Sequence, residues 1–473
     1  MKLSGFTSVC LSITAFLCVL SADAQKDPID TYVRSEMQYQ HIPGLALGLY
    51  AQGKVVRAEG FGMADVELKS PVGPETLFNS GSLAKQFVAT AVMMLVEEGK
   101  ISLDDSVRKY FPSAPRSWEL VKIENLLSHT SGLGDYSSLE LTGRGAPFDF
   151  NVDLTQRELL ERLYKLPIVF APDTDWAYCN TNYMLLGMII EKASGELWQQ
   201  FLEKRIFNPL GMTSTRGTDL RAIIPDRASG YVMENGKLQN EARTAQTWNS
   251  LADGSLYLNV SDLAKWDHAL LTADLLKKST LERMWTVFPL RNGKPNPGNY
   301  GFGFVLSSVN GHRVIGHDGS WQGFHDYSAL YVDDGVEVVV LTNLGHPLSR
   351  PQDIVQVVAG MYNSLLRPPD ILPIPDTHTT LTGKLLSTLE AVISGNINPS
   401  DFTPEMLARV KDLAPAQEWL RTQGPISDFE LVEQEENNEQ QELKYRARTS
   451  VRIFTFTFVL SKSGKIASIE AAS

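Results

Sequence analysis

The sequence has little cysteine and few basic residues. It contains three cysteines in 473 residues, and two of them, Cys10 and Cys18, lie in the first 25 positions. Without these first 25 positions only Cys179 remains, and no internal disulfide can form. The stability of such a chain must come from a large hydrophobic core. Its 43 Lys and Arg face 55 Asp and Glu, a formal net charge of −12. This acidic balance, without a long basic run, argues against nucleic acid as a partner.

Three catalytic or architectural patterns are also missing. The eight histidines show neither His-x-x-x-His nor His-Glu-x-x-His spacing, so we expect no metal and no other cofactor. Gly-x-Ser-x-Gly, the turn that carries the nucleophile of many Ser-His-Asp hydrolases, does not occur. No internal repeat points to a solenoid or propeller. With 43% apolar residues, the chain has the composition of a globular protein.

The first 24 residues have the pattern of a secretory signal peptide. Lys2 precedes an apolar stretch over 3–20, and Ala22-Asp23-Ala24 is a small-x-small site that predicts cleavage after Ala24. An uncleaved membrane anchor is the alternative, but several Ser and Thr dilute the apolar span. No later segment is long and apolar enough to span a membrane. We therefore expect an exported, periplasmic or secreted protein without stable membrane insertion.

The remaining chain divides at a proline-rich segment. We predict one large domain over 25–366, a linker over 367–376 and a small α+β module of unknown role over 377–473. Helical patterns at 380–393 and 403–421 precede strand patterns at 428–434, 441–449 and 451–460. The alternation after 451 suits a strand covered on both faces or nearly so. The acidic stretch 433–442 is interpreted as a solvated hairpin tip.

In the large domain, strand patterns lie at the two ends and helical patterns in the middle. We expect strands over 45–50, 55–58, 302–307, 312–316, 326–332 and 336–342, and helices over 28–40, 82–99, 123–128, 155–164, 183–194, 196–205, 261–271 and 352–364. Gln52-Gly53 and Asp333-Asp334-Gly335 are predicted turns, and Ser261 is a predicted N-cap. The simplest closure is an α/β (α+β) fold, in which the two ends pair in one antiparallel sheet. The helices flank this sheet and form an inserted lobe, and the cleft between lobe and sheet is the expected ligand site.

Ser82 and Lys85 form the first candidate catalytic pair. Residues three apart at a helix start share one face, and the helix N-terminus favours developing negative charge. A desolvated Lys loses its proton more easily and can take the proton of Ser. The pattern alone is weak, because Ser106-Val107-Arg108-Lys109 repeats it and Ser82 could be a plain N-cap.

Two further segments carry suitable groups. In Tyr178-Cys179-Asn180, the phenol can relay a proton and the amide of Asn180 can hold a substrate carbonyl. In His317-Asp318-Gly319-Ser320, Gly319 permits close approach of a substrate backbone. The backbone N–H of Ser320 could form an oxyanion hole with that of Ser82. Taken alone, His317 is interpreted as a satisfied polar residue at a strand end, and Cys179 as a buried packing residue.

In order and in context, these segments resemble the serine β-lactamase and penicillin-binding-protein superfamily. The resemblance is closer to its class C-like branch, which includes family VIII esterases and D-aminopeptidase-type peptidases. It spans about residues 28–365 and rests on the sequence segments 76–87, 126–133, 178–187 and 317–319. The combination is specific, although each short motif by itself is not.

The resemblance implies a role for each matching position. Ser82 is the acylated nucleophile and Lys85 its base partner. Tyr178 is a proton relay, acting as base or acid, and Asn180 contacts the substrate carbonyl or acyl amide. His317 stands where many β-lactamases have Lys in a Lys-Thr-Gly motif. Because His is charged only part of the time near neutral pH, this departure favours esters or small peptides over β-lactams.

The resulting hypothesis is an exported serine hydrolase that forms a covalent acyl-enzyme with a small-molecule or peptide substrate. A β-lactamase or D-Ala-type peptidase is the alternative within this class. A catalytically silent sensor or binder with the same fold is the alternative of another class. His129, in the segment 128–132, is a candidate general base, but in the resembling family this segment is a structural turn.

Overall fold

The computed structural model describes most of the chain. The described residues are 27–138, 140–242, 244–345, 348–368, 373–411, 417, 420–421, 424–436, 440–449 and 453–472. The predicted signal peptide, with Cys10 and Cys18, lies outside them. Among the described residues, no helix combines the length and apolar character needed to cross a bilayer.

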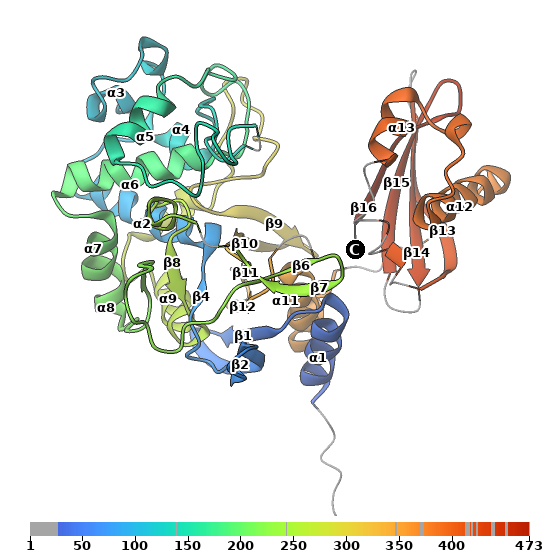
Figure 1. Cartoon of the computed structure of the whole chain (residues 1–473), viewed down its shortest axis with the longest axis horizontal. Helices are drawn as coiled ribbons and strands as arrows, with labels where there is room; N and C mark the ends of the chain where they lie inside the picture. Colours follow the sequence, from blue (N-terminus) through green and yellow to red (C-terminus); the bar gives the residue numbers. More distant parts are fainter. Residues whose placement is uncertain are drawn as a thin grey trace, which may run out of the picture.

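A seven-stranded antiparallel sheet joins the two ends of the first 345 residues (Figure 1). Its order is β3-β2-β1-β12-β11-β10-β9. The strands are β1 (Gly44–Ala51), β2 (Lys54–Asp65), β3 (Ser70–Pro71), β9 (Val305–Val309), β10 (His312–Trp321), β11 (Phe324–Tyr331) and β12 (Val336–Thr342). The predicted pairing of the two ends is confirmed, since β1 pairs antiparallel with β12.

The central strands are buried on both faces. Leu45 and Leu47 of β1 belong to the same core cluster as Val33 of α1 (Pro28–Gln40) and Ile354 of α11 (Pro351–Tyr362). Residues of β1 with the opposite parity, such as Ala46, belong to the second core, which the inserted helices supply. Because strand side chains alternate between faces, β1 reads as a nearly continuous apolar run rather than an alternating one.

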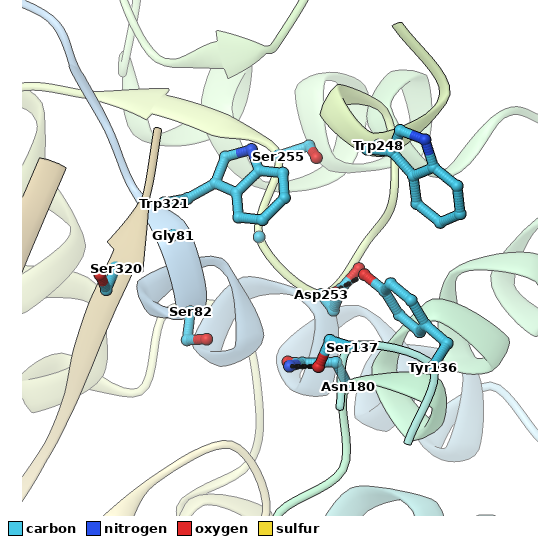
Figure 2. A pocket seen from close by; sticks show the side chains of 11 residues that line it. Gly81, Ser82, Tyr136, Ser137, Asn180, Trp248, Asp253, Ser255, Ser320 and Trp321 are labelled. Atoms are coloured by element: carbon cyan, nitrogen blue, oxygen red, sulfur yellow. Dashed lines mark hydrogen bonds between the residues drawn. The ribbon is translucent and has the colours of Figure 1, made fainter. Parts of the chain in front are cut away.

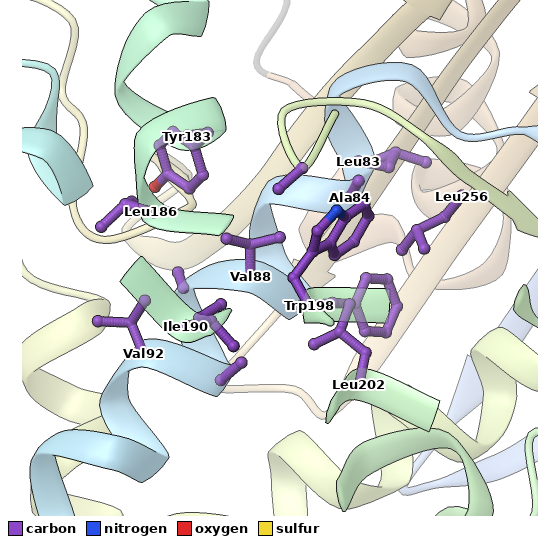
Figure 3. Packing of buried hydrophobic residues seen from close by; sticks show 14 of the residues in the cluster. Leu83, Ala84, Val88, Val92, Tyr183, Leu186, Ile190, Trp198, Leu202 and Leu256 are labelled. Carbon is purple, nitrogen blue, oxygen red and sulfur yellow. The ribbon is translucent and has the colours of Figure 1, made fainter. Parts of the chain in front are cut away.

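The chain between β2 and β9 supplies the inserted helical lobe and several small strands. Its helices are α2 (Ala84–Glu97), α3 (Val107–Tyr110), α4 (Ile123–Ser128), α5 (Gln156–Leu163), α6 (Asn180–Ser194), α7 (Trp198–Leu202), α8 (Asn208–Leu210), α9 (Val260–Thr272) and α10 (Lys278–Met284). The strands are β4 (Phe78–Asn79), β5 (Arg216–Gly217), β6 (Tyr231–Glu234), β7 (Lys237–Asn240) and β8 (Leu256–Leu258). Figure 3 shows α2 and α6 packed together, with Val88 and Val92 facing Leu186 and Ile190. This packing fixes the helices that carry the candidate catalytic residues.

Several predicted boundaries differ from the structure: β2 and β10 extend beyond the predicted 55–58 and 312–316, and β9 replaces the predicted 302–307. Two helix starts also differ. The helix predicted over 82–99 starts with a 3-10 turn, η1 (Gly81–Leu83), before α2. The predicted N-cap Ser261 lies inside α9, and the true N-cap is Asn259, whose side chain accepts from the N–H of Asp262 at 2.7 Å. The extended backbone of Asn259 lets its short side chain turn back to the helix start, which a residue already in the helix cannot do.

The C-terminal residues form a second sheet with its own core. Its order is β13-β14-β15-β16, with bounds Ile426–Glu436, Gln440–Thr449, Ile453–Ser461 and Ile466–Ala472; the helices are α12 (Thr379–Ser394) and α13 (Pro404–Lys411). Phe454, Phe456 and Phe458 are buried against the helices, whereas Thr455 and Thr457 are half-buried. One face is therefore covered more fully than the other, and β16 was not predicted. In the acidic stretch, 437–439 lie outside the described residues.

Two buried carboxyl groups meet where α9 packs on the sheet. Asp267 of α9 is 0% exposed and Glu337 of β12 is 2% exposed. Among the described residues, the carboxyl group of Asp267 has no hydrogen-bond partner other than the carboxyl group of Glu337. Burial raises the pKa of Asp267 from 3.8 to about 7, and burial together with Asp267 raises the pKa of Glu337 well above its usual range. Two carboxyl groups can lie this close only if they share a proton.

This pair should make the protein less stable as the pH rises. The unfolded chain loses these protons near pH 4, whereas in the folded pair Asp267 keeps its proton up to about pH 7 and Glu337 keeps its own to a higher pH. The stabilisation is therefore complete below about pH 4 and is lost as pH rises through about 7, at roughly 1.4 kcal/mol per pH unit. Urea unfolding at several pH values should show this slope in the wild type and a flatter one in Asp267→Asn. Equal slopes would contradict the shared proton.

Candidate active site

Ser82 and Lys85 are in contact where η1 runs into α2. The Nζ atom of Lys85 lies 2.8 Å from the Oγ atom of Ser82. Lys85 is 0% exposed, whereas Ser82 is half-buried and lines an open pocket. Positions three apart on a helix face the same side, so the sequence spacing correctly anticipates this pair. The competing pair is different, because Ser106 caps α3 and accepts from the N–H of Arg108.

The other two contacts of Lys85 are with oxygen atoms that accept hydrogen bonds. Its Nζ atom lies 2.9 Å from Oδ1 of Asn180 and 2.7 Å from the carbonyl oxygen of Asp253. Both oxygens can only accept hydrogen bonds. A neutral amine has two N–H groups and one lone pair, so the two N–H groups satisfy these acceptors. The lone pair then faces the hydroxyl of Ser82, which is the arrangement needed to accept its proton.

Burial makes the neutral form of Lys85 accessible. Desolvation lowers the pKa of Lys85 to about 8, although the carboxyl groups of Asp253, Asp318 and Asp135 act in the opposite direction. A group with this pKa exists in both protonation states near neutral pH, as a proton acceptor that must be regenerated requires. The site thus combines a hydroxyl with a nearby tuned amine.

A chain of hydrogen bonds fixes the orientation of Asn180. Its Nδ2 donates to Oγ of Ser137 at 2.9 Å, and this hydroxyl donates to Oδ2 of Asp135 at 2.9 Å. Oδ1 of Asp135 accepts from the backbone N–H groups of Ser137 and Asn180. Oδ1 of Asn180 therefore points to Lys85. The second N–H of Nδ2 can donate a hydrogen bond to a substrate oxygen.

Tyr178 lies beside this pair, immediately before α6. The Nζ atom of Lys85 lies 4.9 Å from the centre of the Tyr178 ring. The Tyr178 hydroxyl is buried, and the side chain of Ser82 lies close enough to it to lower its pKa through a hydrogen bond. Burial raises its pKa well above 10.0, and the neighbouring side chain of Ser82 only partly opposes this effect. The phenol is therefore protonated at neutral pH.

Strand β10 presses against η1 at the entrance of the pocket. A side chain on Gly319 would put its Cβ atom 2.0 Å from the carbonyl oxygen of Ser80, and one on Gly81 would lie 2.4 Å from the backbone nitrogen of Ser320. Only glycine fits at both positions. Strand β9 pairs with β10 from His312 to Gly316, and no other described strand continues on that side. The free edge of β10 thus lies next to Ser82.

His317 lies behind this edge and is 0% exposed. Its Nδ1 is 2.6 Å from the carbonyl oxygen of Asp318, and its Nε2 is 2.8 Å from the hydroxyl of Tyr300. Because the carbonyl can only accept, Nδ1 carries the hydrogen and Nε2 accepts from Tyr300. Burial lowers the pKa of His317, an effect that Asp318 opposes and Lys85 reinforces. His317 is thus a neutral internal group that orients β10, and its side chain does not line the pocket.

His129 and Cys179 are also internal. His129 ends α4 in a left-handed conformation with φ 61°, and its Nδ1 accepts from the backbone N–H of Cys179 at 3.1 Å. Burial lowers the pKa of His129 well below 6.5. Cys179 is 3% exposed, and burial raises the pKa of its thiol to about 12. Both residues match the structural interpretations made from the sequence.

The pocket in front of Ser82 lies between sheet and lobe (Figure 2). It is lined by Gly81, Ser82, Tyr136, Ser137, Asn180, Trp248, Asp253, Gly254, Ser255, Ser320 and Trp321. Figure 2 shows the Ser82 side chain pointing toward Asn180. Sequence reasoning missed Tyr136, Ser137, Trp248, Asp253 and Trp321. Trp321 follows the predicted 317–320 segment directly, which is the one local signal for any of them.

Comparisons with known proteins agree with this architecture. A family model described as Beta-lactamase matches residues 29–360. Penicillin-binding protein 4* of Bacillus subtilis (strain 168) is 32% identical over 327 residues, which cover 64% of this chain and 70% of that protein. Protein flp of Staphylococcus aureus (strain COL) is 26% identical and covers 69% of this chain and 64% of its own length.

Solved structures show the same fold. An octameric penicillin-binding protein homologue from Pyrococcus abyssi superposes with a TM-score of 0.64 at 24% identity, covering 93% of this chain and 94% of its own. A D-amino acid amidase from Ochrobactrum anthropi SV3 superposes with a TM-score of 0.60 at 24% identity, covering 72% and 99%. At this identity the two structures speak only for the fold. The family match over residues 29–360 goes further: the chain belongs to the beta-lactamase family, a superfamily of serine hydrolases.

Proposed function

We propose that this protein is a serine hydrolase that cleaves an ester or amide through a covalent acyl-enzyme on Ser82. The observation that carries the proposal is the contact of Ser82 with a buried amine whose other two partners accept hydrogen bonds. This arrangement supplies a base to a hydroxyl at the edge of a pocket. A plain N-cap serine needs no such partner.

In the acylation step, the Oγ atom of Ser82 attacks the substrate carbonyl while its proton moves to the Nζ atom of Lys85. The oxygen of the tetrahedral intermediate is held by the backbone N–H groups of Ser82 and Ser320. The close approach of Gly81 to Ser320 supports this pairing of donors. When the intermediate collapses, the bond to the leaving group breaks and the leaving group takes up a proton. Water then releases the acyl group and restores the hydroxyl.

Tyr178 acts as the proton donor to the leaving group rather than as the first base. Its pKa is raised well above 10.0 by burial, whereas that of Lys85 is lowered to about 8. At neutral pH, the neutral amine of Lys85 is therefore much more populated than the deprotonated phenol of Tyr178. Lys85 then passes the proton that it accepted from Ser82 to Tyr178, or passes it through water to the groups that react in deacylation. The side chain amide of Asn180 binds the substrate oxygen.

The substrate class is an ester or a small-peptide amide. A substrate carboxylate gains no cationic partner from His317, because its side chain is buried and its pKa is lowered. A β-lactamase or D-Ala-type peptidase is the second candidate, since Penicillin-binding protein 4* of Bacillus subtilis is 32% identical to this chain. A catalytically silent binder is the third, and the complete set of contacts around Lys85 speaks against it.

Export and domain division complete the proposal. The pattern of the first 24 residues supports removal of a signal peptide and action in the periplasm or outside the cell. The catalytic unit is residues 25–366, followed by a linker over 367–376. Residues 377–473 fold as a separate module, which the core of Phe454, Phe456 and the helices α12 and α13 supports.

The proposal is tested by trapping the intermediate. The protein is incubated with p-nitrophenyl esters, a penicillin and a D-alanyl-D-alanine peptide, quenched in acid and weighed intact. We expect the mass of the ester's acyl group to be added once, on the peptide that contains Ser82. Accumulation only with penicillin would favour the second candidate, and no adduct with any compound or with a fluorophosphonate probe would favour the third.

A further inference from the structure

One short segment of the lobe, residues 135–137, reaches both groups that accept hydrogen bonds from Lys85. The two outer residues of this segment fix Asn180, whose Oδ1 accepts from Lys85. The hydroxyl of the middle residue, Tyr136, donates to Oδ2 of Asp253 at 2.7 Å. The backbone carbonyl of the same Asp253 accepts from Lys85 at 2.7 Å. Figure 2 shows the two connections, from Tyr136 to Asp253 and from the end of the segment to Asn180.

The side chain of Tyr136 is held in place by its surroundings. It is 5% exposed, and its ring stacks on that of Trp248 with centres 5.7 Å apart and planes inclined by 27°. The ring of Phe148 lies 5.9 Å away. The backbone N–H of Tyr136 donates to Oγ1 of Thr181, in the first turn of α6, at 3.1 Å. The hydroxyl is therefore fixed before a substrate binds, as a group that positions another residue must be.

Asp253 needs such a partner because of its place in the chain. It lies in the turn that leads from η4 (Gln246–Asn249) to β8, outside any helix or strand. The direction of its carbonyl group is therefore not set by a regular ladder of backbone hydrogen bonds, and it depends on how the side chain is held. Burial raises the pKa of Asp253, whereas Lys85, the Tyr136 hydroxyl and the N–H of Asp253 itself oppose this effect. The hydrogen bond from Tyr136 thus stabilises the carboxylate and ties the turn to the lobe.

Asp253 also acts on Lys85 through its charge. Among the acidic groups that raise the pKa of Lys85, Asp253 has the largest effect. Burial keeps the neighbouring thiol and phenols protonated and the neighbouring imidazoles neutral near neutral pH. The titratable groups around Lys85 are the carboxyl groups of Asp253, Asp318 and Asp135, the thiol of Cys179, the phenols of Tyr178 and Tyr183 and the imidazoles of His129 and His317.

We propose that Tyr136 is a positioning residue for the base of the reaction. Its hydroxyl holds the carboxyl group of Asp253, and the carbonyl of Asp253 holds the amine of Lys85 within reach of Ser82. This inference rests on the proposed function, in which Lys85 accepts the proton of Ser82. Tyr136 itself neither gains nor loses a proton. If Tyr136 only filled space beside Trp248, its ring would suffice and its hydroxyl would not matter to the rate.

Tyr136→Phe tests the hydroxyl, because it keeps the ring. We expect the rate of acylation by p-nitrophenyl butyrate at saturation to fall by about tenfold, with KM changed by about threefold or less, since the amine loses its orientation while the pocket keeps its wall. Tyr110→Phe is the matched control. Tyr110 donates to Oδ2 of Asp105 at 2.8 Å, at the end of α3, and neither residue lines the pocket. Its loss should change the rate by about twofold or less. A wild-type rate in folded Tyr136→Phe would overturn the proposal.

Two variants of Asp253 test the same link from its other end, without altering the aromatic rings. Asp253→Asn keeps an oxygen that can accept from Tyr136, whereas Asp253→Ala does not. We expect the asparagine variant to be acylated about threefold or more faster than the alanine variant. In both variants the rise of the rate with pH should move to lower pH, because the carboxylate no longer raises the pKa of Lys85. Equal rates in the two variants, or an unmoved pH profile, would contradict the proposal.

The double variant decides whether Tyr136 acts through Asp253. In the Asp253→Ala background the link is already broken, so Tyr136→Phe should slow acylation further by about twofold or less. Losses that multiply in the double variant would mean that Tyr136 acts by another route, and the proposal would be wrong. The outcome for the proposed function is read separately from the wild type. If no ester acylates Ser82 there, the proposed function fails; if Ser82 is acylated and the hydroxyl of Tyr136 has no effect, only the present inference fails.

Discussion

Ser82→Ala should abolish turnover while the protein remains folded. The variant removes the only atom proposed to bond to the acyl group, and Ser82 is half-buried at the pocket, so its loss leaves no large cavity. We expect hydrolysis of p-nitrophenyl butyrate to fall by about four orders of magnitude or more. The measurement is single-turnover release of p-nitrophenol, together with the intact mass after acid quench. Circular dichroism and thermal unfolding verify the fold.

Ser106→Ala is the matched control, because Ser106 belongs to the same Ser-x-x-Lys pattern but caps α3. Its loss should lower the free energy of unfolding by about 1 kcal/mol and leave turnover unaltered. The assignment of the nucleophile would be wrong if the folded Ser82→Ala protein retained its rate or its acyl adduct. It would also be wrong if the two variants lost activity equally.

Lys85→Met should have the second largest effect. The variant keeps a long apolar stem in a fully buried site but removes the atom that contacts Ser82, Asn180 and the carbonyl of Asp253. We expect the acylation rate to fall by about a thousandfold. Two acceptors then lose their donor, so the free energy of unfolding should also fall, by about 1–3 kcal/mol each. Stopped-flow acylation and urea unfolding separate the two effects.

The wild-type pH profile provides an independent check of the role of Lys85. Only the neutral amine can accept the proton of Ser82, and the pKa of Lys85 is about 8. The rate of acylation should therefore rise with pH and level off above about 8. Lys109→Met, which alters the exposed lysine of the competing motif, should keep this profile. A wild-type rate that is independent of pH, or that falls on the alkaline side, would argue against Lys85 as the base.

Much of the fold could be predicted from local patterns. The strands β1 and β12 and the helices α2 and α6 were found because their apolar residues recur at the spacing of strands or helices, which depends on neighbours within a few positions. The boundaries were less accurate for the same reason. Whether Asn259 or Ser261 caps α9 depends on the backbone just outside the helix, which the pattern of apolar residues does not record.

The candidate site was predicted in part. The contact of Ser82 with Lys85 follows from their spacing on one turn, and the phrases around Tyr178 and His317 marked the other segments. The resemblance gave His317 a place in the substrate site, whereas the structure buries its side chain away from the pocket, in agreement with the interpretation of His317 taken alone. Its partner Tyr300 lies 17 positions away in a loop, and only the packed structure brings the two together.

Taken by itself, the sequence determined the family, the contact of Ser82 with Lys85 and the order of strands and helices, because these depend on residues adjacent in the chain or on segments that stay together. The tertiary structure alone decided the pKa of Lys85 and which residues line the pocket. The carbonyl of Asp253 lies 168 positions from Lys85, and Trp321 follows 72 positions after its partner Asn249. Burial and hydrogen-bond direction set the pKa of an amine and the charge of a cavity. Both depend on atoms that only the folded chain brings within a few ångströms of each other.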